Sequence, residues 1–148
     1  MKVLIEPAIL VSTGKKLGEQ LRSVKSTRYH VDIMDGRFVP KKTIGSRSLK
    51  KARTNAFIEA HLMIRDPIKH IKEFASCADL LVPHIEALKD PAKFIADAHH
   101  LGVQVGLAVN PETPITSILH FVPDLDYVLI MTVHPGKQGQ YFHAEALK

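Results

Sequence analysis

Short β-rich runs alternate with helical patterns along the chain, and this alternation constrains the fold more than any other feature. The runs recur at roughly one per 25 residues, as expected for successive βα units. Six strands are predicted, at residues 3–10, 29–34, 57–63, 80–86, 103–109 and 127–133. No two of them are joined by a two-residue hairpin signal, so we expect parallel strands joined by right-handed crossovers. Such crossovers build either an open doubly wound sheet or a closed (β/α)8 barrel, and periodicity alone does not separate the two.

Helix-start signals support this α/β reading. The segments "DPIKHIKEF", from Asp66, and "DPAKFIADAHHLG", from Asp90, each place an aspartate at the expected N-cap and a proline at the first helical position. Gly102 stands where the second of these helices is expected to stop. The basic stretch "SRSLKKAR", residues 46–53, also has helical spacing.

Composition limits the class of protein. The chain of 148 residues with 45% hydrophobic residues is predicted to form a single domain over residues 1–148. Its apolar runs are shorter than the roughly 20 residues that a membrane helix needs, and the N-terminus does not read as a signal peptide. A single cysteine excludes an internal disulfide framework and suits a reducing compartment. We therefore expect a cytoplasmic protein with no membrane partner.

The formal net charge of +5 suits a nucleic acid, a membrane surface or a phosphorylated metabolite. The densest basic stretch, residues 46–53, has no interleaved aromatic residues and no nucleic-acid motif, so a solvated helix face explains it better. We expect no nucleic-acid partner.

Polar residues gather on one face of the predicted sheet. Residues two apart on a strand share a face, so His30, Asp32 and Met34 point one way, and His61 with Met63 repeat the pattern on the next strand. Further polar or soft side chains follow the later strands, namely His84, Glu86, Asn110 and Met131. All of them stand at carboxyl ends of strands, where active sites lie in both parallel architectures.

Two imidazoles and a carboxylate, His30, His61 and Asp32, have the ligand types of a site for zinc, iron, manganese or cobalt. The alternative is that each histidine is a hydrogen-bonded core residue and that the methionines fill gaps in the packing. The loop "HPGKQGQ", residues 134–140, places two glycines after a strand, where backbone N–H groups can converge on a phosphate. Glycines there are equally explained by the geometry of a turn.

Several segments resemble the signatures of the ribulose-phosphate 3-epimerase family: "HVDIMDGRFVP", "TIG", "EAHLMI", "PHIEA", "AVNPETPI" and "VLIMTVHPG". The similarity runs from about residue 7 to residue 142. It implies a TIM (β/α)8-type barrel that interconverts D-ribulose 5-phosphate and D-xylulose 5-phosphate, a step of the pentose phosphate pathway, by proton abstraction and return through an enediolate.

The resemblance also implies roles for individual residues. One divalent metal ion is bound by His30, Asp32 and His61, and Asp32 is in addition one of two catalytic acid/base groups. The positions expected to contact the sugar phosphate are Met34, Met63, His84, Met131, Pro135, Gly136 and Gly139, the last three in the phosphate loop. Chemistry agrees with two acid/base groups, because inverting a carbon next to a ketone removes a proton from one face and returns one to the other.

Two departures from the family pattern affect substrate choice. The first-strand segment reads "PAILVS" where the family has "PSILS", so Ala8 replaces a serine that contacts a substrate hydroxyl. The phosphate loop "HPGKQGQ" carries Lys137 and Gln138 where the family usually reads "NPGFGGQ". An epimerase of a six-carbon ketose phosphate, such as allulose 6-phosphate, is therefore an alternative.

The largest departure is length. The chain ends at Lys148, after the sixth predicted strand, whereas the (β/α)8 fold typically needs 200 residues or more. We expect an incomplete barrel of about six βα units, the N-terminal two thirds of the fold, from which the second catalytic aspartate is absent. One hypothesis is a fragment of a longer epimerase; the other is a non-catalytic remnant that binds a metabolite or pairs with another chain, including a second copy, through its open edge.

Overall fold

The computed structural model describes residues 3–52 and 54–147 and contains one six-stranded parallel sheet. The strands follow one another in sequence order across the sheet. They are β1 (Ala8–Ile9), β2 (Arg28–Met34), β3 (Phe57–Met63), β4 (Leu80–Pro83), β5 (Gln104–Val109) and β6 (Tyr127–Ile130). Sequential order with parallel pairing is the arrangement of a barrel and not of a doubly wound sheet, in which the strand order reverses.

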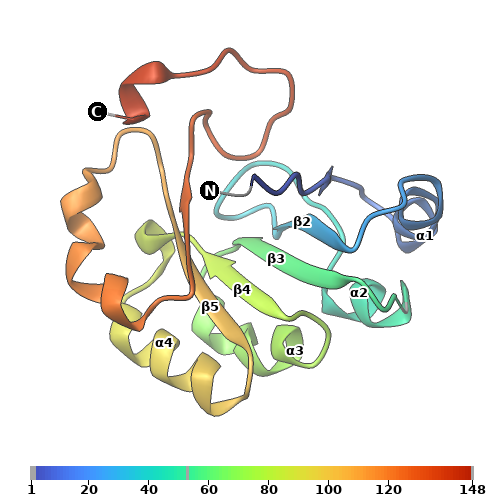
Figure 1. Ribbon diagram of the computed structural model, residues 1–148, viewed down its shortest axis with the longest axis horizontal. Coiled ribbons are helices and arrows are strands. Elements are labelled where there is room, and N and C mark those ends of the chain that lie inside the picture. The colour runs from blue at the N-terminus through green and yellow to red at the C-terminus, as the bar shows by residue number, and fades with distance from the viewer. Residues whose placement is uncertain (1–2, 53, 148) are drawn as a thin grey trace.

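Helices fill the connections between the strands. The α-helices are α1 (Gly14–Ser23), α2 (Ser46–Ala52), α3 (Ile71–Ala75) and α4 (Pro91–His100). Short 3-10 segments complete the connections: η1 (Pro67–His70), η2 (Ile85–Ala87), η3 (Ile115–Ser117), η4 (Leu119–Asp124) and η5 (Ala144–Leu147). Figure 1 shows the sheet curling with α2, α3 and α4 along its outer side, so the fold is an incomplete TIM barrel, as predicted.

Three predicted strands were too long by several residues. The strand predicted at 3–10 is only Ala8–Ile9, because these are the residues that pair with β2. The strand predicted at 80–86 ends at Pro83, whose successors turn into η2. The strand predicted at 127–133 ends at Ile130, because its partner β5 ends opposite it at Val109.

Both predicted helix starts are confirmed in position, but only one of the two aspartates makes a capping hydrogen bond. Asp90 caps α4, since its carboxylate accepts a hydrogen bond from the Lys93 backbone N–H at 2.9 Å, and Gly102 follows α4 with φ +77°. Asp66 also stands at the predicted N-cap position, directly before Pro67 of η1, but its φ is 53° and its side chain makes no capping hydrogen bond; the carboxylate pairs instead with Lys69 Nζ at 3.2 Å. Of the predicted helical stretch 46–53, α2 covers 46–52, and residue 53 lies outside the described residues.

The main core lies between the sheet and its helices. Outward-facing strand residues such as Val31 and Ile33 pack there with the fully buried Leu17 of α1 and Phe94 of α4. The inner face instead carries polar side chains, and the β2–β3 register sets Asp32 opposite His61 and Met34 opposite Met63. None of the helices in the described parts of the chain combines the length and the apolar character needed to cross a membrane.

Candidate active site

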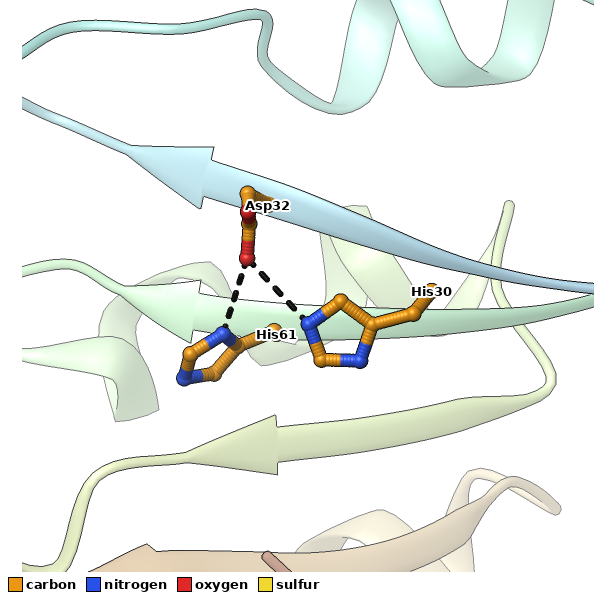
Figure 2. Close-up of side chains that lie close together, drawn as sticks. All are labelled: His30, Asp32 and His61. Carbon is orange, nitrogen blue, oxygen red and sulfur yellow. Dashed lines mark hydrogen bonds and ion pairs between the residues drawn. The ribbon is translucent and has the colours of Figure 1, made fainter. Parts of the chain in front are cut away.

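Three polar side chains from two neighbouring strands meet on the inner face of the sheet. Asp32 Oδ1 lies 2.9 Å from Nδ1 of His61 and 3.2 Å from Nε2 of His30 (Figure 2). The register explains the meeting, because His61 is directly opposite Asp32 and His30 precedes Asp32 by two residues on the same face. The predicted triad is thus brought together by strand pairing alone.

A threonine that the sequence analysis missed fixes the end of β2. The Thr43 hydroxyl donates to the carbonyl of Asp32 at 2.7 Å and accepts from the backbone N–H of Met34 at 2.8 Å. It therefore ties the loop before α2 to the strand that carries the triad. The sequence offers no local signal for this contact, because the loop returns to the strand only in three dimensions.

A glutamate that the sequence analysis also missed supports His30 from behind. Glu59 is fully buried, and its Oε1 lies 2.6 Å from Nδ1 of His30. Its spacing of two from His61 on β3 places it on the same inner face. That alternation was a usable signal for Glu59.

His84 lies behind His61 and not beside the cavity. It is fully buried, its Nε2 lies 2.8 Å from Nε2 of His61, and its ring packs against Phe38 at 4.9 Å between centroids. On its other side Nδ1 lies 3.4 Å from Oε2 of Glu86. His84 is therefore close to the triad but does not line the space in front of it.

The hydrogen bonds and the burial of the triad shift the pKa values of all three side chains. Burial works against a charged His30, but hydrogen bonds to Asp32 and Glu59 raise its pKa to about 9. Burial also opposes ionisation of Asp32, yet hydrogen bonds from the two histidines hold the pKa of this carboxyl well below its usual range. Burial lowers the pKa of His61 to about 4. At neutral pH the site thus combines an ionised Asp32, a protonated His30 and a neutral His61.

The donor set fits a divalent cation. One ligand atom from each of His30, Asp32 and His61 lies within 4.8 Å of the others. Two imidazoles and one carboxylate are a common ligand set for zinc, iron, manganese and cobalt in proteins. A cation there requires that His30 release its extra proton, since only a neutral imidazole is a ligand.

A cavity of about 160 Å³ opens in front of the triad. Its lining includes the predicted residues Met34, Met63, Met131, Pro135 and Gly136, together with Lys137 and Gln138. Gly139 and His84 do not line it. A larger hollow of about 490 Å³ lies elsewhere, among residues such as Leu49, Cys77 and Asp79, and none of the predicted site residues line it.

The loop after β6 is tightly folded. Gly136 has φ +98°, and a Cβ there would lie 3.0 Å from Cβ of Val39. Gly139 has φ +72°. The Gln140 side-chain amide donates to the carbonyls of His134 and Lys137 at 2.6 and 2.9 Å. Turn geometry therefore accounts for both glycines, while the loop still presents Lys137 to the cavity.

Comparison with known proteins identifies relatives along almost the whole chain. A model of the "Ribulose-phosphate 3 epimerase family" matches residues 4–148. The ribulose-phosphate 3-epimerase of Schizosaccharomyces pombe is 42% identical over 153 residues, covering 97% of this chain and 67% of that protein. The enzyme of the same name from Bacillus subtilis is 38% identical over 146 residues, with 95% and 67% coverage. The chloroplastic ribulose-5-phosphate-3-epimerase of Arabidopsis thaliana is 35% identical, with 99% and 55% coverage.

The chain spans about two thirds of the length of most of the curated relatives it matches.

Proposed function

The chain belongs to the ribulose-phosphate 3-epimerase family, and on this premise we propose that it supplies the metal-binding half of a site that interconverts D-ribulose 5-phosphate and D-xylulose 5-phosphate in the pentose phosphate pathway. The observation that carries the proposal is the ionised Asp32, held between two histidines on the wall of a cavity at the carboxyl ends of the strands. This is where a barrel enzyme places its reacting groups.

Asp32 is the proposed general base. It is the one carboxylate among the described residues that line the cavity, and it is ionised at neutral pH, the form that can accept a proton from the carbon next to the ketone. Epimerisation also needs a proton donor on the opposite face of that carbon. The described part of the cavity lining offers no second carboxylate for this role.

The proposed cofactor is one divalent metal ion held by His30, Asp32 and His61. When bound, such an ion supplies Lewis-acid stabilisation of negative charge on the substrate oxygens. The methionines Met34, Met63 and Met131 offer an apolar wall, while Lys137 and the backbone of the loop 135–140 are proposed to hold the phosphate.

A coupled assay for ribulose 5-phosphate epimerisation tests the proposal. The 148-residue chain is assayed with and without zinc, manganese, cobalt or ferrous ion, beside Asp32→Asn and the matched control Asp124→Asn, which alters an exposed aspartate. Because no second carboxylate lines the described cavity, we expect turnover to be slow; it should be metal-dependent, fall by roughly 10²-fold or more in Asp32→Asn, as for loss of a general base, and be unchanged in the control. No turnover from a folded, metal-loaded chain would contradict epimerase activity at this length.

The substrate and location are part of the same proposal. The partner is a small-molecule ketose phosphate, with neither nucleic acid nor membrane, and the compartment is the cytoplasm. The Arabidopsis thaliana relative is a chloroplastic protein. Allulose 6-phosphate in place of ribulose 5-phosphate tests the six-carbon alternative, which the altered residues Ala8, Lys137 and Gln138 motivate.

A further inference from the structure

On the side away from the cavity, His30 contacts a carboxylate directly, and His61 is linked to a second carboxylate through His84. The proposed reaction uses neither carboxylate. Behind His30 lies Glu59, whose Oε1 is 2.6 Å from Nδ1. Nε2 of the same ring faces Asp32 Oδ1 at 3.2 Å. A carboxylate only accepts, so Glu59 keeps the ring proton on Nδ1. Once His30 has released its extra proton, Nε2 is the nitrogen whose lone pair is available on the cavity side.

Behind His61 the support has two steps. Nδ1 of His61 faces Asp32, and Nε2 lies 2.8 Å from Nε2 of His84. If Nδ1 is to bind a cation, the proton of His61 must lie on Nε2, from which it is donated to His84. The Nδ1 proton of His84 then faces Oε2 of Glu86, 3.4 Å away. The Glu86 carboxylate favours that arrangement, because it stabilises a proton on Nδ1 of His84.

Glu86 is itself held in place. Its Oε1 accepts hydrogen bonds from the backbone N–H of Asn110, at 2.9 Å, and from the hydroxyl of Thr113. Burial raises the pKa of Glu86, but the close contact with His84 and these bonds lower it to about 2. The carboxylate is therefore anchored to the loop after β5 and leaves Oε2 directed at His84.

We propose that Glu59 and Glu86 are positioning residues that select the ring nitrogens presented to a divalent cation, Nε2 of His30 and Nδ1 of His61. The inference rests on the metal site of the proposed function. Carboxylates behind ligating histidines commonly fix the tautomer and orientation of the ring, and their loss weakens metal binding by about 10–100-fold. Here one carboxylate acts directly and the other through His84.

Cobalt binding by the full 148-residue chain tests the proposal without relying on turnover. Co²⁺ is titrated by visible absorption into the wild type, Glu59→Gln, Glu86→Gln and the control Glu73→Gln. Glu73 is a matched control, because its carboxylate lies 3.8 Å from a ring nitrogen of the exposed His70 but has no contact with the triad. We expect both site variants to bind Co²⁺ at least about tenfold more weakly, and the control to bind as the wild type does.

Nitrogen-15 NMR of the zinc-loaded chains separates positioning from a general loss of structure. The wild type is expected to carry protons on Nδ1 of His30, Nε2 of His61 and Nδ1 of His84. Glu59→Gln is expected to lose this pattern only in His30, and Glu86→Gln only in His84 and His61. If Glu59→Gln unfolds, Glu86→Gln decides, because Glu86 is partly exposed. A wild type that binds no Co²⁺ overturns the metal site and this inference together. Cobalt affinities or proton patterns that match the control overturn this inference alone.

Discussion

At the scale of single residues, Asp32 is flanked by two histidines that titrate on opposite sides of neutrality. The pKa of His30 is raised to about 9 and that of His61 is lowered to about 4. At neutral pH a cation must displace the extra proton of His30, whereas His61 is already neutral and has no extra proton to lose. Metal affinity is therefore expected to depend on pH through His30.

The sign of that dependence follows from the raised pKa. Below pH 9 each cation bound must displace one proton from His30, so the affinity for Co²⁺ is expected to rise about tenfold per pH unit between pH 6.5 and 8.5. Calorimetric titrations in buffers of different ionisation enthalpy measure this, and should count close to one proton released. An affinity independent of pH, with no proton release, would contradict it.

Thr43 gives a second prediction, for stability. In Thr43→Val the buried N–H of Met34 loses its acceptor and the carbonyl of Asp32 loses a donor, which is expected to cost about 1–3 kcal/mol. Thr43→Ser keeps the hydroxyl and serves as the matched control. Urea unfolding measures the difference, and equal stabilities of the two variants would argue against the role of this hydroxyl.

The sequence was sufficient for residues whose position follows from strand alternation. His30 and Asp32 share a face because of their spacing, which was readable, whereas the register that sets His61 opposite Asp32 comes from the structure. Thr43 was not readable, since its partners lie nine and eleven residues away on a strand that the loop returns to. His84 was placed near the site correctly, but its position behind His61 depends on how β3 and β4 pair.

At the scale of elements, β5 and β6 approach closely at one glycine. A Cβ on Gly106 would lie 2.8 Å from the carbonyl oxygen of Tyr127 and 2.9 Å from its Cβ. Gly106→Ala is expected to destabilise the chain by about 1–3 kcal/mol, because the two strands must separate. The control Gly45→Ala, where nothing lies within 4 Å, is expected to have little effect. Equal unfolding midpoints in urea would contradict the close approach.

The sequence predicted which strands and helices are present, but not the residues at which they end. The alternation of patterns indicated six strands, but not where each one ends: β6 ends opposite the end of β5, and β4 ends where the chain turns into η2. Asp66 shows the same limit for helices. It stands at the N-cap position that its sequence indicates, yet its backbone is left-handed and its carboxylate pairs with Lys69, so it makes no capping hydrogen bond.

At the scale of the molecule, the sheet has two outer strands. Within the described residues β1 pairs with β2 alone and β6 with β5 alone. Apolar side chains are also exposed, among them Val3, Ile5, Tyr141 and Phe142. Unpaired strand edges and exposed apolar groups favour association, so we expect the 148-residue chain to self-associate as its concentration rises. Sedimentation velocity over a concentration series measures this; a monomer throughout would contradict it.

The barrel itself illustrates what patterns can and cannot decide. Periodicity left an open sheet and a barrel as alternatives, and the family signatures favoured the barrel that the strand order confirms. That residues 1–148 act as a single domain stays a prediction.

Exchange of the C3 proton of ribulose 5-phosphate tests the central claim most directly, because it requires proton removal by Asp32 but not return to the opposite face. The cobalt- or zinc-loaded chain is incubated with the substrate in D₂O, and the C3–H signal is followed by proton NMR. The account predicts metal-dependent loss of that signal for the wild type and for Asp124→Asn, and none for Asp32→Asn. A folded, metal-loaded wild type that leaves the signal intact, or an Asp32→Asn variant that exchanges it equally fast, would contradict the account.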